Sequence, residues 1–291
     1  MRSMRILVTG AAGLIGSAVA ALLQREHEVV GLDRRPGAQV DVVADIRDPL
    51  DLARFDAVVH VAALHAPHVG HASGAEFRSV NVDGTARLLD AALAGGVSRF
   101  VFTSTTSLYG HALEPRGGRA AWIDEAVEPE PRDIYDETKL AAEALVRAAG
   151  LNGAILRMSR CFPEPLRDMA LYRLHRGIDR RDVARAHALA LHVAAADAPA
   201  FVISARTPFL PEDREALVGD APAVIRLRAP ALAERFERLG WPLAGTIGRV
   251  YSSAYAADRL RFIARYDAVS VLDGDCDPRP LETTGGETRS G

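Results

Sequence analysis

The sequence has few cysteines, few aromatic residues and no large excess of charge of either sign. Its 291 residues include only Cys161 and Cys276, 6% are aromatic, and the formal net charge is −3. Two cysteines exclude a scaffold held by several disulfides and favour a reducing compartment, so we expect the cytoplasm. Without a basic surface we expect neither nucleic acid nor a membrane as partner, but a small-molecule substrate.

The sequence also lacks an internal repeat and any apolar run as long as a membrane-spanning helix requires. Hydrophobic residues make up 48% of the chain and charged residues 25%. This composition is typical of a globular protein with a sizeable core. The length fits one large α/β domain, or a nucleotide-binding domain with a smaller lobe.

Short apolar runs alternate with helical patterns along most of the chain. Strands are predicted at residues 5–9, 28–32, 40–43, 57–61, 99–103, 154–156 and 200–203. Helices are predicted at residues 14–23, 50–54, 79–94, 134–149, 182–196 and 231–239. Strands that are apolar on both faces and separated by helices predict an α/β fold, a doubly wound parallel sheet covered on each side.

A glycine-rich turn joins the first predicted strand to the first predicted helix. The segment TGAAGLIG places Gly10, Gly13 and Gly16 at this turn. These glycines permit a tight turn and close backbone approach, so a pyrophosphate can lie at the helix N-terminus, where free N–H groups and the helix dipole attract it. An ordinary strand-to-helix turn is the alternative, and the βα context favours the dinucleotide.

The residues after the second and third strands bear on the choice of dinucleotide. Asp33 closes the second strand and is placed to accept hydrogen bonds from the adenosine ribose hydroxyls, which favours NAD. Arg34 and Arg35 follow at once and would suit a 2′-phosphate, so NADP stays possible. Asp45 and Ile46 would lie near the adenine, with a solvated loop carboxylate as the alternative for Asp45.

Tyr135 and Lys139, in YDETK, stand four residues apart on one face of a predicted helix. A tyrosine hydroxyl has a pKa of about 10 in water. A neighbouring lysine cation would lower that pKa and make tyrosinate available as a general base for a substrate alcohol. The spacing alone is common on helix surfaces, but it follows the glycine turn and the hydroxyl-rich TSTTSLYG, where a ligand is expected at the sheet edge.

Together these segments resemble the extended short-chain dehydrogenases/reductases, the NAD-dependent epimerase/dehydratase family, over roughly Arg5 to Asp267. The matching segments are TGAAGLIG, Asp33, ADI, HVAA, NVDGT, TSTTSLYG, YDETK and DVARAHALAL. The resemblance implies a Rossmann-like domain with a small C-terminal substrate lobe, and a homodimer through the helices around Asn81 and Tyr135. It also implies that Thr105 is the catalytic Ser/Thr beside Tyr135 and Lys139.

The same resemblance assigns binding residues by position. For the cofactor they are Gly10, Gly13, Leu14, Ile15, Gly16, Asp33, Arg34, Asp45, Ile46, Val61, Ala62, Ala63, Asn81, Thr103, Tyr135 and Lys139. For the substrate they are Leu64, His65, Thr106, Ser107, Arg160 and Arg167.

The predicted domains follow from these landmarks. Residues 1–160 would form the NAD(P)-binding domain, completed by about 178–205. Residues 161–177 and 206–272 would form the substrate lobe. The polar stretch 273–291 is predicted to be a disordered tail.

Departures from the family pattern narrow the chemistry. The 4,6-dehydratases carry an Asp-Glu pair after the catalytic Thr, where this chain has Thr106 and Ser107. Hydroxyl groups titrate too high for that acid–base role, so dehydration is disfavoured. RMSRCFPEP has Arg160 at the family's Asn position and is locally similar to uronate dehydrogenases, in which an Arg grips the carboxylate. Arg160 and Arg167 are the candidates here, with exposed surface charges as the alternative.

Two further groups of residues invite a chemical interpretation that the sequence does not support. The histidines of HAPHVGH lie in a segment with Pro67 and Gly70, and no Cys or carboxylate completes a site, so no metal is expected. This loop is expected to lie over the nicotinamide or the substrate. Cys161 has no evident paired base and is expected to be a small buried residue.

Three functional hypotheses follow. The leading one is an NAD(P)-dependent oxidoreductase or epimerase that acts on a hydroxyl or ketone of a sugar or nucleotide sugar through Thr105, Tyr135 and Lys139. The second is oxidation of a small acidic sugar in the manner of uronate dehydrogenases. The third is a non-catalytic NAD(P)-sensing protein that has kept the fold.

Overall fold

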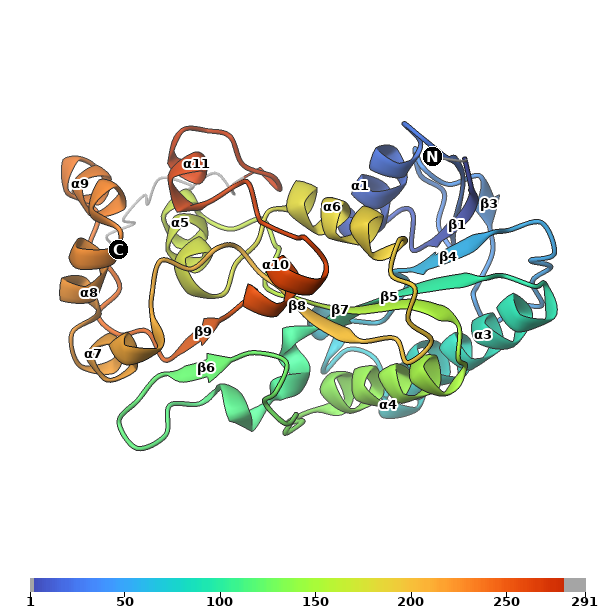
Figure 1. Cartoon of the computed structure of the whole chain (residues 1–291), viewed down its shortest axis with the longest axis horizontal. Coiled ribbons are helices and arrows are strands. Elements are labelled where there is room, and N and C mark those ends of the chain that lie inside the picture. Colours follow the sequence, from blue (N-terminus) through green and yellow to red (C-terminus); the bar gives the residue numbers. More distant parts are fainter. Residues whose placement is uncertain (1–2, 280–291) are drawn as a thin grey trace, which may run out of the picture.

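The computed structural model describes residues 3–279 and has a central seven-stranded parallel sheet (Figure 1). The strand order is β3-β2-β1-β4-β5-β7-β8. The strands are β1 (Arg5–Thr9), β2 (Glu28–Asp33), β3 (Val42–Val43), β4 (Ala57–His60), β5 (Arg99–Thr105), β7 (Asn152–Met158) and β8 (Ala200–Ile203). The predicted α/β class and parallel sheet are confirmed.

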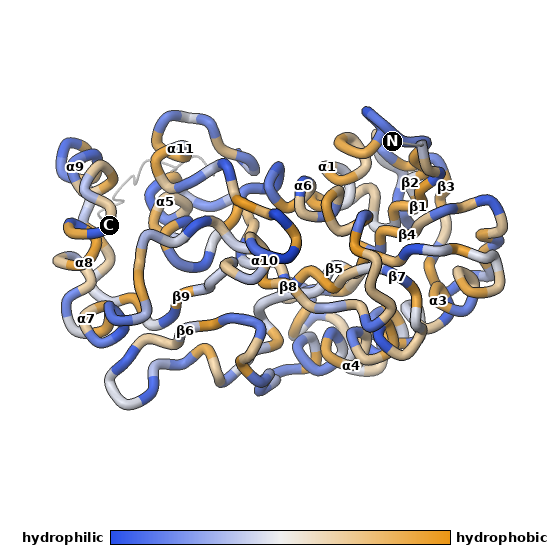
Figure 2. The backbone as a smooth tube through the Cα atoms, viewed as in Figure 1, coloured by the Kyte–Doolittle hydropathy of each residue, from blue (hydrophilic) through white to orange (hydrophobic). Residues whose placement is uncertain are grey.

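Helices cover both faces of this sheet because its strands are apolar on both faces. Ile6 and Val8 point to the face covered by α1 (Leu14–Leu23) and α6 (Arg180–Ala190). Leu7, between them, points to the opposite face, covered by α3 (Gly84–Ala94) and α4 (Ile134–Ala148). Figure 1 places α1 and α6 on one side of the sheet and α3 and α4 on the other. In Figure 2 the hydrophobic colouring follows the strands between these two layers.

A smaller lobe has a hydrophobic core of its own, which includes Met169, Phe209, Phe236 and Val250. Its helices are α5 (Leu166–His175), α7 (Arg214–Gly219), α8 (Ala221–Arg228), α9 (Pro230–Arg238) and α11 (Ala268–Leu272). The short helix α10 (Ala254–Arg259) packs instead against the main sheet through Ala256. The lobe lies at the end of the sheet where β5 and β7 finish (Figure 1).

The lobe also takes a strand from the first half of the chain. β6 (Ala121–Ile123) pairs in parallel with β9 (Arg249–Tyr251) in a two-stranded sheet. The predicted division assigned residues 1–160 to the cofactor domain, so the structure differs here. The segment between β5 and α4 crosses into the lobe, because the pairing of β6 depends on a strand that lies far along the chain.

Short helical segments complete the fold. They are η1 (Ala66–His68), α2 (Gly74–Arg78), η2 (Ser79–Asp83), η3 (Thr106–Tyr109), η4 (His111–Leu113) and η5 (Pro211–Asp213). The predicted helix at 79–94 therefore begins earlier and contains a π-helical turn, η2, before α3.

Two helix predictions need correction. Residues 50–54 do not form a helix, because Asp51 Oδ1 accepts the N–H of Ala53 at 3.0 Å in a local turn. The helix predicted at 182–196 is α6, which begins earlier, after its N-cap Asp179, and ends at Ala190.

The predicted disordered tail is in part ordered. The backbone N–H of Asp277 donates to Asp179 Oδ2 at 2.8 Å, and Arg180 Nε donates to Asp277 Oδ2 at 2.8 Å. Residues 273–279 therefore pack against the start of α6, since polar composition alone does not exclude ordering by ion pairs. The remainder of the predicted tail, 280–291, lies outside the described residues.

Candidate active site

A cavity of about 540 Å³ lies where the strands of the main sheet end and the small lobe begins. The carboxyl edge of a parallel sheet is the usual ligand site of this architecture. The predicted site residues that line this cavity are Gly10, Gly13, Leu14, Ile15, Gly16, Asp33, Arg34, Asp45, Ile46, Val61, Ala62, Ala63, Leu64, His65, Thr103, Thr105, Thr106, Ser107, Tyr135, Lys139 and Arg160. Two predicted residues, Asn81 and Arg167, do not line it.

The glycine turn has no room for side chains. A Cβ on Gly16 would lie 2.1 Å from the carbonyl oxygen of Gly10, and Gly10 itself has φ +72° with Ala62 N 2.8 Å from an added Cβ. No side chain caps the N-terminus of α1, and its first turn carries no acidic residue. These residues therefore fit a dinucleotide, since a bare helix N-terminus with close backbone approach suits its phosphates.

The end of the cavity lined by the glycine turn is called the cofactor end here, and it contains the carboxylates of Asp33 and Asp45. Both carboxylates form hydrogen bonds within the protein. Asp33 Oδ2 accepts the N–H of Ala12 at 3.1 Å, and Asp33 Oδ1 accepts that of Arg35 at 3.0 Å. Asp45 receives two side-chain hydrogen bonds from Arg47, at 2.9 and 2.7 Å, and these hold the pKa of Asp45 below its usual value. These hydrogen bonds fix both carboxylates at the carboxyl ends of β2 and β3.

A buried chain of hydroxyl and imidazole groups fixes the loop after β4. Thr9 Oγ1 accepts the N–H groups of Val61 and Ala62 at 3.1 and 3.2 Å, so its own proton is directed to His60 Nδ1 at 2.8 Å. His60 Nε2 then faces Thr85 Oγ1 at 3.0 Å. Burial lowers the pKa of His60 to about 3, so this histidine is neutral at neutral pH.

Asn81 supports the site from behind the cavity. Its Oδ1 accepts the N–H of Leu64 at 2.8 Å, and its Nδ2 donates to Leu64 O at 2.9 Å and to Thr138 Oγ1 at 3.1 Å. Asn81 lies in the π-helical turn η2 and ties the loop that carries Leu64 and His65 to helix α4. The structure therefore gives Asn81 a positioning role and not a place in the cavity wall.

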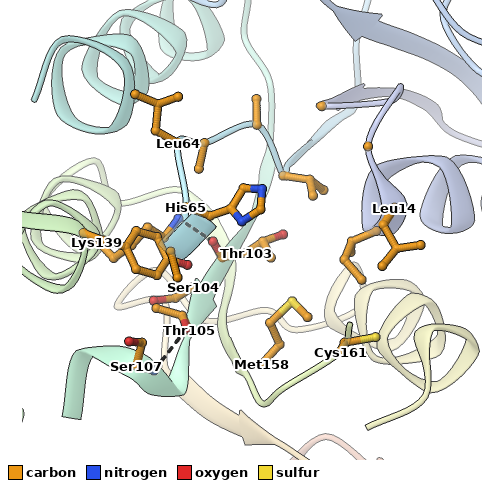
Figure 3. A pocket seen from close by; sticks show the side chains of 18 of the residues that line it. Leu14, Leu64, His65, Thr103, Ser104, Thr105, Ser107, Lys139, Met158 and Cys161 are labelled. Carbon is orange, nitrogen blue, oxygen red and sulfur yellow. Dashed lines mark hydrogen bonds between the residues drawn. The ribbon is translucent and has the colours of Figure 1, made fainter. Parts of the chain in front are cut away.

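Thr105, Tyr135 and Lys139 converge on the same cavity from β5 and α4. Lys139 Nζ donates to the carbonyl oxygen of Thr103 at 2.6 Å and lies 3.9 Å from the centre of the Phe102 ring. Figure 3 shows Thr103, Ser104, Thr105 and Ser107 following one another along one side, with Leu14, Met158 and Cys161 across the cavity. One face of α4 thus meets the hydroxyl-rich end of β5.

The two predicted catalytic groups have pKa values shifted in opposite directions. Burial raises the pKa of Tyr135 to about 12, against a hydrogen bond from Thr105. Burial lowers the pKa of Lys139 to about 7, against the charge of Glu143. The predicted lowering of the Tyr135 pKa by Lys139 does not appear in the protein alone, because Lys139 is directed to the backbone of β5.

A buried ion-pair network lies behind Lys139. Glu143, one helical turn further on α4, accepts from Ser104 Oγ at 2.6 Å and from Arg157 Nε and Nη2 at 3.0 and 2.8 Å. Arg157 Nη1 also donates to Tyr109 Oη at 3.0 Å. This network joins β5, α4 and β7, and the sequence did contain a signal for it, since Glu143 continues the four-residue spacing of Tyr135 and Lys139.

The other end of the cavity, where a substrate is expected, is lined by arginines and is called the substrate end. Arg160 is paired with Glu164, and its guanidinium lies 5.2 Å from the Phe162 ring centre. Arg176 and Arg249 also line the cavity, and the Nε of each is buried without a hydrogen-bond partner among residues 3–279. Burial, and then the charge of Arg249, lower the pKa of Arg176.

Arg167 lies elsewhere, with its Nε donating to Pro242 O at 3.2 Å. The structure therefore does not bring Arg167 to the cavity, because its side chain is directed to the backbone of Pro242 in the lobe. Sequence reasoning missed Arg176 and Arg249, which lie after α5 and in β9 and have no local pattern that marks them.

Within residues 3–279 no group of three or more His, Cys, Asp or Glu side chains is arranged to hold a metal ion. In the same part of the chain no helix is both long and apolar enough to cross a membrane. His65 and His68 line the cavity, and their rings meet edge to face with centres 4.6 Å apart.

The fold and cavity define a dinucleotide-binding α/β protein of the doubly wound type. The family model "NAD dependent epimerase/dehydratase family" matches residues 6–167, and the chain belongs to this family. The predicted resemblance, an enzyme of this family and NAD as its cofactor are thereby confirmed. The local resemblance to uronate dehydrogenases is not shown and stays a prediction, as does the argument against dehydration.

Individual relatives support the family and differ in their named activities. A 3-beta-hydroxysteroid dehydrogenase of Mycolicibacterium neoaurum is 36% identical over 51% of this chain and 43% of its own length. A UDP-glucose 4-epimerase of Corynebacterium glutamicum is 34% identical over 53% of this chain and 50% of its own length. The chain thus spans about half the length of these relatives.

One solved structure matches almost the whole chain. It is a short-chain dehydrogenase/reductase superfamily protein of Agrobacterium tumefaciens with bound NAD, 26% identical, with a TM-score of 0.69. The match covers 93% of this chain and 95% of that one. The small lobe is therefore part of a known arrangement and not an unrelated addition.

Proposed function

We propose that this protein is an NAD-dependent oxidoreductase or epimerase that acts on a hydroxyl or ketone of a sugar-like substrate through Thr105, Tyr135 and Lys139. The observation that carries the proposal is that these three side chains and the glycine turn line one cavity. Its volume of about 540 Å³ lies within the range of small-molecule sites. The cytoplasm and a homodimer stay predictions.

The chain's residues divide the chemistry between them. When bound, NAD supplies the hydride acceptor and a positive charge on its oxidised ring. Tyr135, with a pKa raised to about 12 by burial, is protonated near neutral pH and can donate its proton to a substrate carbonyl. In the oxidation direction Tyr135 must lose that proton, which a positive charge in the cavity favours. The Thr105 side chain acts to lower the pKa of Tyr135 and would orient the reacting oxygen.

A Tyr135→Phe variant tests this proposal. Oxidation of glucuronate, UDP-glucose and UDP-glucuronate would be followed by NADH absorbance, and epimer formation from the same substrates by chromatography. We expect turnover to fall at least about 100-fold, the usual contribution of a general acid–base group, while NAD affinity stays within about threefold. The matched control is Tyr255→Phe, which removes a hydroxyl from a half-exposed ring stacked on Phe201, away from the cavity. Undiminished turnover in Tyr135→Phe would rule the mechanism out.

The cofactor content of the purified protein separates the two reaction types. An epimerase recycles its NAD and would be isolated with about one NAD per chain, whereas a dehydrogenase must exchange it. Extraction of the denatured protein and chromatography of the released nucleotide measure this ratio. A protein free of nucleotide that still interconverts two sugar epimers without added NAD would contradict this assignment.

The arginines favour an acidic substrate as the finer assignment. Buried guanidinium groups without partners suit a carboxylate or a phosphate, which can accept their forked hydrogen bonds. Arg176 and Arg249 are half-buried, line the cavity, and each has a buried Nε without a hydrogen-bond partner among residues 3–279. Both a free uronate and a nucleotide sugar would satisfy it, and the substrate comparison above distinguishes them, because only one of the two should turn over efficiently.

A further inference from the structure

Lys139 is the only lysine of this chain. The sequence contains 35 lysine and arginine residues in total, and all the others are arginines. The guanidinium of arginine stays charged in proteins, whereas the ammonium of lysine is compact and shifts its pKa readily when buried. The one lysine thus lies at the proposed catalytic site, where a compact ammonium that can titrate is useful.

Lys139 makes two close contacts with groups that carry no net charge. Its Nζ donates to the carbonyl oxygen of Thr103 at 2.6 Å and lies 3.9 Å from the centre of the Phe102 ring. The residue is only 4% exposed, so water contributes little to its solvation. A buried ammonium is costly unless its charge is compensated, so a carboxylate close by would stabilise it.

Glu143 is the carboxylate that follows Lys139 on the same buried face of α4. Side chains four residues apart on a helix are neighbours on its surface. Glu143 is fully buried, and both of its oxygens accept hydrogen bonds. Its Oε1 accepts from Ser104 Oγ at 2.6 Å and from Arg157 Nε at 3.0 Å. Its Oε2 accepts from Arg157 Nη2 at 2.8 Å and from Arg147 Nη2 at 3.1 Å.

Ser104, Glu143 and Arg157, called the Glu143 clamp here, join three elements of the fold at one point. Ser104 of β5 and Arg157 of β7 are partners in the parallel register of the two strands, so both donors reach the carboxylate from neighbouring positions. Glu143 brings α4 to the same point. The helix cannot slide along the strands without breaking several buried hydrogen bonds, and buried polar groups left unpaired are costly.

The Glu143 clamp is one residue away from groups that line the cavity. On β5, Ser104 lies between Thr103, whose carbonyl accepts from Lys139, and Thr105 of the proposed catalytic set. Ser104 and both threonines line the cavity. Figure 3 shows the three residues in succession on the side of the cavity where Lys139 lies. Helix α4 is thus tied to β5 by hydrogen bonds at successive strand residues, one through Lys139 and one through Glu143.

We propose that Glu143 is a positioning residue that fixes the place of Lys139 in the cavity wall, through its clamp on β5 and β7. The inference rests on the proposed function and deepens it, because it adds a group that acts through the catalytic lysine. Glu143 does not line the cavity. Its effect on the reaction therefore passes through Lys139 and the end of β5.

The charges at this point agree with the assignment. Burial acts to raise the pKa of Glu143, but hydrogen bonds from Arg157 and Ser104 and the nearby arginine charges lower it below its usual value. Glu143 is therefore ionised near neutral pH. Burial lowers the pKa of Lys139 to about 7, and the Glu143 charge acts against that shift. The Glu143 clamp therefore also favours the charged form of the lysine.

The other titratable groups around Lys139 supply no negative charge near neutral pH. Burial raises the pKa of Tyr135, four residues earlier on α4, to about 12. Burial, and then the Lys139 charge, lower the pKa of His60 on β4 to about 3. Burial also lowers the pKa of His65, in the loop after β4. Glu143 is thus the group here whose charge stabilises the protonated lysine.

Because Lys139 is the only lysine, a single signal reports its position. The full chain would be grown with lysine labelled with ¹³C at the ε carbon, and the ring current of Phe102 should displace the one side-chain signal from its position in urea. We expect Ser104→Ala to move this signal part of the way toward its unfolded position, and Glu143→Gln to move it further. A signal that stays in place in both folded variants would overturn the proposal, whether or not a substrate has been found.

The same signal reports the charge of Lys139 when the pH is varied. We expect a pKa of about 7 in the unaltered protein and a pKa lower by about 1 or more in Glu143→Gln, the usual effect of losing a nearby opposite charge. If Glu143→Gln does not fold, the paired variant Glu143→Gln/Arg157→Met takes its place, because it leaves no member of this ion pair buried without the other. A Lys139 pKa that does not fall in the folded variant would contradict the assignment.

The matched control is Glu137→Gln, which removes a carboxylate from the exposed face of the same helix. Glu137 forms an exposed ion pair with Arg78 at 3.3 Å. This variant should leave the signal and the pKa of Lys139 as they are. If it changes them as much as Glu143→Gln does, the effect is that of the helix charge and Glu143 is not a positioning residue.

Turnover shows what the position of Lys139 contributes to the proposed reaction. With whichever of glucuronate and UDP-glucose turns over, we expect Glu143→Gln to lower kcat about fivefold or more at pH 7 and to leave the KM for NAD unchanged. A fall of the Lys139 pKa from about 7 to about 6 lowers its charged fraction at this pH from about one half to about one tenth. The alkaline limb of the pH profile should move to lower pH by the same amount.

The conservative variant Glu143→Asp keeps the charge and should keep the alkaline limb in place. A Glu143→Gln protein with a lower Tm and an unchanged pH profile would show that the Glu143 clamp serves stability alone, and the proposal would be wrong. Retained turnover in Tyr135→Phe, by contrast, would refute the proposed function and leave the Lys139 signal and titration results standing.

Discussion

The cofactor end and the substrate end of the cavity differ in how far the protein satisfies its own polar groups. At the cofactor end, both oxygens of Asp33 accept backbone N–H groups, and Asp45 is paired with Arg47. At the substrate end, Arg176 Nε, Arg249 Nε and Ser159 Oγ are buried without partners among residues 3–279. Unsatisfied buried donors are costly, so we expect a ligand to bind at the substrate end.

The difference follows from how each end is assembled. The glycine turn and Asp33 come from consecutive strand-turn-helix units, so the conformation of neighbouring segments largely determines them. Arg160, Arg176 and Arg249 come from three segments that meet in the lobe. Backbone bonds join two of these, since Arg160 N donates to Arg176 O at 3.0 Å. Where the segments are close in sequence, the polar groups of the cavity wall are paired within the protein. Where the segments are distant in sequence, donors remain unpaired and are available to a ligand.

The largest expected effect is a loss of NAD affinity when the glycine turn at the cofactor end is altered. In Gly16→Ala the added Cβ would lie 2.1 Å from Gly10 O, so the turn must shift and its N–H groups lose their alignment. We expect NAD affinity to fall at least about 100-fold, or roughly 2.8 kcal/mol. Isothermal titration with NAD measures this. Gly13→Ala, whose Cβ would be 3.2 Å from the same oxygen, should cost less. Equal affinities for both variants would show that the turn is not preformed.

An intermediate effect is expected at the substrate end. Arg176→Met removes a half-buried guanidinium from the cavity wall and should raise the KM for an acidic substrate about 10- to 100-fold, the cost of a lost charge-assisted hydrogen bond. NAD affinity should stay unchanged. The matched control is Arg167→Met, on the outside of the lobe, which should leave both constants as they are. If Arg167→Met raises KM and Arg176→Met does not, the assignment of the substrate end is wrong.

The difference between contacts that are local in sequence and contacts that depend on the fold also explains which features the sequence predicts. β1 and α1 match their predicted bounds because strand, glycine turn and helix are adjacent in sequence. Tyr135 and Lys139 reach the cavity as their four-residue spacing predicts. The direction of Lys139 toward Thr103 O was not predictable, because it depends on β5 lying under α4. Arg176 and Arg249 were missed for a similar reason, since their proximity depends on the fold of the lobe.

The smallest expected effect concerns the pH range in which the hydrogen bonds of buried His187 to Thr103 and Val183 are kept. His187 Nδ1 lies 2.8 Å from Val183 O and its Nε2 lies 2.7 Å from Thr103 Oγ1, so the neutral ring carries its proton on Nδ1 and accepts from Thr103. Burial lowers the pKa of His187 to about 4. A second proton on this ring would face a hydroxyl that already donates to it.

The sign of the pH effect follows from that shift. The folded pKa of His187 is about 4 and lies below its ordinary value of 6.5, so the unfolded chain binds more protons between these values. His187 therefore costs stability as pH falls through this window, by about 1.4 kcal/mol per pH unit. Urea unfolding at several pH values from 7 to 5 measures the slope. His187→Gln should make it shallower by that amount, and the exposed His71→Gln should not. Identical slopes in all three proteins would mean that the folded protein does not hold His187 neutral.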